Sequence, residues 1–140
     1  PVSNVREPKI VKFGDVDANI VFVATGSMVT TAVRVANDRY PAAEVWSIPC
    51  LKLFDVSAIK EIANRNEVFI VVLEEHSVMG GLGSIIAEVF SETLGIRILR
   101  IGVKDRFSEF CGSYDYLLKE HGLDDCSVGR QVSDFLQRCK

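Results

Sequence analysis

The sequence VFIVVLEEHSVMGGLGSII, residues 68–86, carries the clearest change of structural pattern in the chain. Its first six residues are apolar, as in a strand that is covered on both faces of a parallel sheet. Two carboxylates and a histidine follow, and glycines then lead into an apolar pattern of helical period. The stretch therefore predicts a buried strand over 68–73, a polar loop, and a helix with one apolar face formed by Leu82, Ile86, Val89 and Phe90.

The segments on either side repeat this order of strand and helix. Strands are predicted at 9–13, 20–24, 44–48 and 97–101, and helices after Ser27, after Asp55 or Ser57, from Ser113 to Gly122, and from Ser127 onward. Such alternation indicates an α/β fold with helices on both faces of a parallel sheet. The continuous apolar runs at 20–24 and 68–73 predict inner strands, whereas the alternating runs at 44–48 and 97–101 predict outer, less buried ones.

Composition limits the classes of function. The chain has 140 residues, 48% of them hydrophobic, and a formal net charge of -3, which fits one soluble domain and argues against a nucleic-acid partner. Its apolar runs are far shorter than the roughly 20 residues of a membrane helix, so no membrane partner is expected. The four cysteines lack zinc-site spacing, so we expect reduced thiols, a cytoplasmic location and no metal site. Residues 1–8 are polar with a proline at each end and predict a linker from a preceding domain, which leaves 9–140 as the folded domain.

The predicted strand order reverses direction between the strands at 20–24 and 68–73, which predicts a crevice between the loops 25–27 and 74–83. For the second loop, two interpretations stay open for the glycines and two for the carboxylates. Its glycines can hold an anion at the start of a helix, or can simply let the helix pack closely on the sheet. Its carboxylates can supply acid–base or contact groups, or one of them can bind N–H groups at the helix start while the histidine is a surface or interface residue. The candidate interface or anion-contact residues here are Glu74, Glu75, His76, Gly80, Gly81, Gly83 and Ser84.

A second candidate is the loop 102–112, which mixes charged residues with Phe107 and Phe110. The planar guanidinium of Arg106 can bind an anionic group. The more ordinary interpretation is that the loop buries its aromatic rings and pairs Asp105 with a nearby cation. No nucleophile stands beside either candidate loop in the sequence, so no catalytic, cofactor-binding or metal-binding residue is assigned.

Four segments in order resemble the C-terminal domain of the transketolase family of thiamine diphosphate enzymes: IVFVATGSMV at 20–29, SIPCLKLFD at 47–55, EEHSVMGGLGSIIAEVF at 74–90 and IGVKDRFSEFCGSYDYLLKEHGLD at 101–124. The resemblance implies three α/β/α layers around a five-stranded mixed sheet, in which four strands are parallel and the strand at 9–13 is an antiparallel edge beside 44–48. Lys104, Ser108 and Cys111 depart from common family residues and leave open transketolase, deoxyxylulose phosphate synthase and the beta-type subunits of 2-oxo acid dehydrogenases.

The resemblance also implies a function. The parent enzyme would transfer two-carbon ketol units between sugar phosphates with thiamine diphosphate and magnesium, both held by upstream domains or a separate subunit. This domain would bind no cofactor, would contribute to assembly of a homodimer, and would be inactive in isolation. The alternatives are a stand-alone regulatory module that binds an anion or nucleotide, and the same domain of a deoxyxylulose phosphate synthase.

Overall fold

The computed structural model describes residues 10–15, 17–52, 55–65 and 67–139, so the predicted linker at 1–8 lies outside these ranges. No helix of the described residues is long and apolar enough to cross a membrane. Strands and helices alternate as predicted, in the order β1 (Val11–Gly14), β2 (Ile20–Ala24), α1 (Met28–Arg39), β3 (Glu44–Ser47), α2 (Val56–Lys60), the short 3₁₀ helix η1 (Glu61–Asn64), β4 (Val68–Ser77), α3 (Leu82–Val89), β5 (Ile96–Val103), α4 (Tyr114–Glu120) and α5 (Asp125–Arg138).

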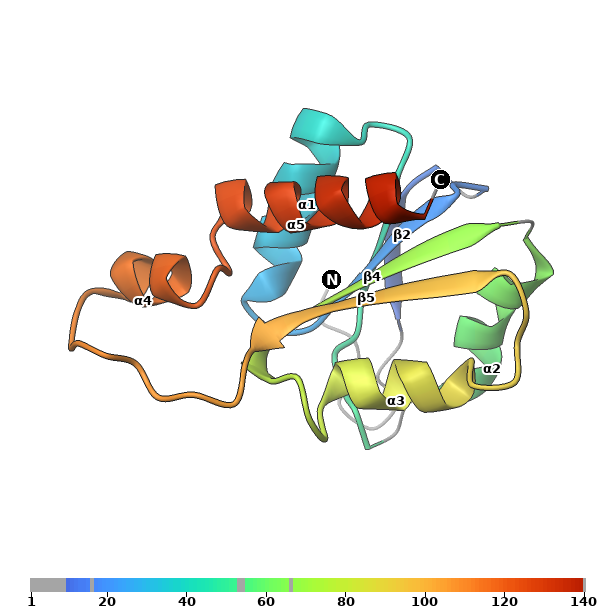
Figure 1. Ribbon diagram of the computed structural model, residues 1–140. Coiled ribbons are helices and arrows are strands. Elements are labelled where there is room, and N and C mark those ends of the chain that lie inside the picture. Colours follow the sequence, from blue (N-terminus) through green and yellow to red (C-terminus); the bar gives the residue numbers. More distant parts are fainter. Residues whose placement is uncertain (1–9, 16, 53–54, 66, 140) are drawn as a thin grey trace.

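The sheet has five strands in the order β1-β3-β2-β4-β5. β1 is antiparallel to β3, and the other neighbouring pairs are parallel, which confirms the expected mixed sheet with an antiparallel N-terminal edge. Figure 1 shows α1 and α5 on one face of the sheet and α2 and α3 on the other. The three-layer α/β/α prediction is therefore confirmed, and the carboxyl ends of the four parallel strands lie along one edge.

The core consists of two apolar clusters, one on each face of the sheet. Phe22 and Val71 face the cluster under α1 and α5, whereas Val21 and Ile70 face the cluster over α2 and α3. Because successive residues of a strand point to opposite faces, a strand buried on both faces must be apolar at every position. This explains the continuous apolar runs of β2 and β4, which lie in the middle of the sheet.

β3 is more buried than its alternating sequence predicts. Val45 is 3% exposed and Trp46 is fully buried, and the Glu44 side chain at the start of the strand is buried as well. The prediction of an outer, less buried strand is wrong because β1 pairs along the free edge of β3 and makes it an interior strand. A charged residue at such a position requires a partner of opposite charge.

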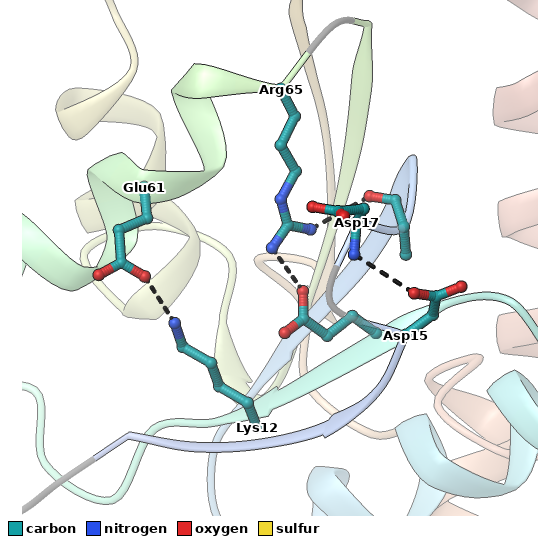
Figure 2. A network of polar contacts seen from close by, with 7 residues as sticks. Lys12, Asp15, Asp17, Glu61 and Arg65 are labelled. Carbon is teal, nitrogen blue, oxygen red and sulfur yellow. Dashed lines mark hydrogen bonds and ion pairs between the residues drawn. The ribbon is translucent and has the colours of Figure 1, made fainter.

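Arg65 supplies that partner at the amino ends of the strands. Its Nη2 lies 2.7 Å from Oε2 of Glu44, and its Nη1 donates to the carbonyl oxygen of Ala18 at 3.2 Å. The side chains of this pair are only 14% and 3% exposed. Figure 2 shows Arg65 beside a second, exposed pair, in which Nζ of Lys12 lies 2.7 Å from Glu61. Arg65 therefore ties the end of η1 to β3 and to the turn before β2.

Helix α5 begins two residues earlier than predicted. Asp124, not Ser127, is its N-cap residue, and Oδ1 of Asp124 accepts hydrogen bonds from the N–H groups of Cys126 at 3.1 Å and Ser127 at 3.2 Å. Burial is the largest influence on the pKa of Asp124 and raises it, but the Ser127 hydroxyl and these N–H groups outweigh burial. The pKa of Asp124 is consequently lowered from its ordinary 3.8.

Replacing Asp124 by alanine should lower the free energy of unfolding by about 1 kcal/mol at neutral pH, the usual effect of losing an N-cap acceptor. A carboxylate whose pKa is lower in the folded state contributes its stability above its unfolded pKa, and loses it as the pH falls through the folded value. Urea unfolding of the parent and variant chains should therefore give a difference that shrinks below about pH 4. Asp124→Asn keeps an acceptor oxygen and should show a smaller loss with little pH dependence. Equal free energies of unfolding for the parent chain and both variants would contradict this role.

Candidate functional site

The carboxylates and histidine that follow the central apolar run lie within β4, not in a loop after it. β4 continues to Ser77, and its ladder with β5 resumes at Ser77 and Val103 after an irregularity that begins at Leu73. The predicted loop is wrong because β5 is long enough to keep pairing with β4 beyond the apolar run. Side chains along the extension differ in exposure: Glu74 is buried, whereas Glu75 and His76 are exposed.

Glu74, on β4, binds the start of α3. Its Oε2 accepts the N–H of Leu82 at 2.7 Å, and its Oε1 accepts the N–H of Gly83 at 2.9 Å, with the side chain 1% exposed. These N–H groups have no partner within the helix, and the positive end of the helix dipole favours a carboxylate there. The interpretation that one glutamate satisfies the N–H groups of the helix start is confirmed.

The glycines around Glu74 allow this close approach. A Cβ atom on Gly81 would lie 1.9 Å from Oε2 of Glu74, and one on Gly83 would lie 3.0 Å from Oε1. Gly102 of β5 closes the other side, where a Cβ would lie 3.2 Å from Cγ of Glu74. The anion held at this helix start is therefore the chain's own carboxylate, and the N–H groups of Leu82 and Gly83 cannot bind an external anion at the same time.

The other two candidates of the glycine segment also have internal partners. The N–H of Gly80 donates to Oγ of Ser84 at 2.9 Å, and the Ser84 hydroxyl donates to the carbonyl oxygen of Val78 at 3.4 Å. Gly80 has a φ of 79°, a conformation that favours glycine. Together these contacts close the turn between β4 and α3, so this segment is built for packing and not for holding a phosphate.

Glu75 joins three elements at the carboxyl edge. One of its oxygens, Oε2, accepts hydrogen bonds from the hydroxyls of Ser27, just before α1, and of Tyr114, at the start of α4, the latter at 2.7 Å. Ser27 directly precedes α1, as predicted, but it has helical dihedral angles and its side chain makes no capping bond. Its hydroxyl instead bonds Glu75, 48 residues away in the sequence.

Tyr114 is a member of this cluster that sequence reasoning missed. The Ser27 hydroxyl is the largest influence on the pKa of Tyr114 and lowers it, but the Glu75 carboxylate, partial burial and Asp115 together raise that pKa above its usual value. Tyr114 therefore remains a neutral hydrogen-bond donor at physiological pH. Its 39-residue separation from Glu75 left no local signal of the contact.

His76 and the loop after β5 lie at the same edge. The ring of His76 is exposed, and its Nδ1 lies 3.2 Å from the carbonyl oxygen of Ser77. In the loop, Arg106 lies 3.6 Å from Oε1 of Glu120, whereas Asp105 is exposed and has no ion pair in the described part of the chain. Among the described residues Asp105 does not pair with a cation as expected, because the neighbouring cation, Arg106, pairs with Glu120 instead.

The aromatic residues of this loop are not buried either. Phe107 is 96% exposed and Phe110 is 66% exposed, contrary to the interpretation that the loop would bury its rings. The side chains of Arg106 and Ser108 contact the end of α4, at Glu120 and at its C-cap residue His121, whereas the two rings face solvent. The loop is thus ordered by polar contacts and not by an apolar core of its own.

In the part of the chain that the structure describes, the edge contains acidic groups but no assembled reaction centre. Glu74 is occupied by two helix N–H groups and Glu75 by two hydroxyls. Among the described residues, no group of three or more His, Cys, Asp or Glu side chains is arranged to hold a metal ion. The side chains that the structure describes at this edge therefore do not fit a magnesium–diphosphate group.

Comparisons with known proteins agree with the fold. The family model "Transketolase, C-terminal domain" matches residues 12–138. The 6-deoxy-6-sulfo-D-fructose transketolase subunit SqwH of Clostridium sp. strain MSTE9 is 33% identical over 123 residues, which are 86% of this chain and 38% of that protein. The 1-deoxy-D-xylulose-5-phosphate synthase of Cupriavidus necator is 37% identical over 114 residues, 81% of this chain and 17% of that enzyme.

A solved structure described as "Split gene transketolase, inactive beta4 tetramer" is similar to this chain with a TM-score of 0.80 and 33% identity. The matched region covers 94% of this chain and 43% of the chain in that structure. The chain thus spans less than half the length of each of these similar proteins.

Proposed function

Because the chain belongs to the transketolase C-terminal domain family, we propose that it is the assembly domain of an enzyme that transfers two-carbon ketol units between sugar phosphates. The resemblance found in the sequence is confirmed by the family match. Enzymes of this family depend on thiamine diphosphate, which with magnesium supplies the bond-breaking chemistry. In this proposal the cofactor lies on upstream domains or on a separate subunit, and the parent enzyme is a cytoplasmic homodimer.

One observation carries the proposal of an assembly role. Glu74 is the most buried acidic side chain at the carboxyl edge, and both of its carboxylate oxygens accept hydrogen bonds from N–H groups at the start of α3. An acid–base catalyst must reach a substrate proton, and a carboxylate enclosed by Gly81, Gly83 and Gly102 cannot do so. His76 is exposed at the same edge and is available for contact with the rest of the enzyme.

The same geometry weakens the alternative of a stand-alone module that binds an anion or nucleotide. That function needs free N–H groups at the start of α3, and Glu74 already holds two of them. The alternative of a deoxyxylulose phosphate synthase keeps its support, because a synthase is among the similar proteins. Both enzyme classes assign this domain the same role, so the choice between them concerns the substrates of the parent enzyme alone.

Reconstitution tests the proposal. The 140-residue chain should show no ketol transfer from a ketose phosphate to an aldose phosphate, even with thiamine diphosphate and magnesium added. Mixing it with the cofactor-binding domains of the parent enzyme, produced as a separate polypeptide, should restore turnover, with activity saturating at an equimolar ratio. Turnover by the chain alone, or full turnover by the other polypeptide without it, would overturn the assigned role.

A further inference from the structure

The segment between β5 and α5 projects from the body of the molecule. Figure 1 shows α4 and the loop before it extending past the carboxyl ends of the strands, away from both helical layers. α4 has no buried residue, and Tyr114 and Tyr116 on it are 51% and 41% exposed. Leu118 of α4 packs partly buried against the core cluster under α1 and α5, but a helix without a fully buried residue gains little from that core, because most helical stability comes from packing of an apolar face.

Polar contacts nevertheless hold the loop in one arrangement. The N–H of Glu109 donates to Oε1 of Glu120 at 2.8 Å, and Arg106 binds the carboxylate and the carbonyl oxygen of Glu120. Oγ of Ser108 lies 2.8 Å from Nε2 of His121. Glu120 and His121, at the end of α4, thus hold residues 106, 108 and 109 of the loop. We call these contacts the α4 clasp.

The clasp leaves two phenylalanine rings facing outward. Phe107 is 96% exposed and Phe110 is 66% exposed, and each lies next to a residue that the clasp holds. An aromatic ring buries roughly 150–250 Å² when it is enclosed, and such rings are typical anchors at the centres of protein interfaces. Because polar contacts already hold this loop in one arrangement, little further ordering of its backbone is needed when the exposed rings bind a partner surface.

We propose that Phe107 and Phe110 are the anchors by which this chain docks on the cofactor-binding part of its enzyme, inserting into an apolar pocket there. This inference rests on the proposed function. The chain covers only 38% and 43% of two similar transketolase proteins, so most of such an enzyme lies outside it. The loop that carries the rings follows the carboxyl end of β5, and Tyr114 at the start of α4 bonds Glu75 at the same edge of the sheet.

The charge around the rings favours a protein over a lipid surface. Residues 104–116 contain two basic and three acidic side chains, so the segment lacks the basic surplus that attracts anionic membranes. Both phenylalanines are therefore expected to enter a protein pocket, with Lys104, Asp105 and Glu109 at its polar rim.

Binding of the chain to the cofactor-binding domains of the parent enzyme, produced as a separate polypeptide, tests this inference. The double variant Phe107→Ser/Phe110→Ser should bind about thirty-fold or more weakly than the parent chain, the loss typical of interface anchors. Its melting temperature should be unchanged, because both rings are exposed in the free chain. Leu94→Ser is the matched control, since Leu94 is 97% exposed and lies at the amino edge of the sheet, and its affinity should equal that of the parent chain.

The outcomes separate the two claims. If the parent chain binds and the double variant binds equally well, the inference fails while the proposed function stands. If the parent chain does not bind, both fail. Sedimentation of the chain alone and with phosphatidylcholine–phosphatidylserine vesicles identifies other occupants: self-association or vesicle binding that the double variant abolishes would overturn the proposal.

A clasp variant adds a second readout. Glu120→Ala should speed hydrogen exchange of the Glu109 amide, which donates to that carboxylate, and should weaken binding although both rings are intact. Unchanged affinity of Glu120→Ala would show that the ordered loop is not required for docking and would contradict this part of the proposal.

Discussion

Replacing Glu74 by alanine should lower the free energy of unfolding by about 3 kcal/mol or more. Each hydrogen bond to a charged group contributes about 1.5–3 kcal/mol, and removing the acceptor leaves the buried N–H groups of Leu82 and Gly83 without partners. The truncation also leaves a cavity between β4 and α3. Equilibrium unfolding in urea, followed by far-ultraviolet circular dichroism, measures the loss.

The neighbouring Glu75 is the matched control for this substitution. It is the same residue type on the same strand, but it is exposed and its partners are hydroxyls. Glu75→Ala should cost less than about 1 kcal/mol, as surface substitutions usually do. Equal losses for the two variants would show that Glu74 is not the acceptor that holds α3 in place, and the account of this edge would be wrong.

The second large effect is expected at the amino edge of the sheet. Arg65→Met should destabilise the chain by about 3–5 kcal/mol, because it leaves the carboxylate of Glu44 buried without a counter-charge. The methionine keeps much of the side-chain volume, so most of the loss comes from the charge and from the bond to Ala18. The same urea titration measures it.

Two further variants show whether charge is the cause. Glu44→Gln combined with Arg65→Met removes both charges and should recover part of the lost stability. Lys12→Met breaks the exposed pair of Figure 2, in which the side chains are 37% and 62% exposed, and should cost about 1 kcal/mol or less. A double variant that is no more stable than Arg65→Met, or a Lys12 variant that loses as much, would contradict the role assigned to the buried pair.

Most of the fold follows from local patterns in the sequence. The apolar runs of β2 and β4 and the alternation in β5 are properties of single segments, and they were enough to predict which strands lie inside the sheet. β3 was the exception, because its burial depends on β1, a strand whose residues pair with it from 30 or more positions away in the sequence. The antiparallel position of β1 came from the family resemblance and not from its turn residues.

The site was only partly predictable, because its contacts join distant segments. That one of the two glutamates binds the helix start was among the predicted alternatives, because a helix start follows eight and nine residues ahead of Glu74; the sequence did not show which glutamate it is. The binding of Glu75 to Ser27 and Tyr114 depends on how three elements meet, which no local pattern records. Phe107 was expected inside because it is apolar, but the polar residues beside it bind α4 and turn the ring outward.

The central claim is that this chain contributes assembly and that the cofactor is held elsewhere. Isothermal titration calorimetry of the purified chain with thiamine diphosphate and magnesium tests this claim most directly. The carboxylates of the edge are bound to the chain's own N–H and hydroxyl groups, so no saturable heat is expected up to millimolar cofactor. Stoichiometric binding at micromolar concentration would place a cofactor site on this chain and contradict the account.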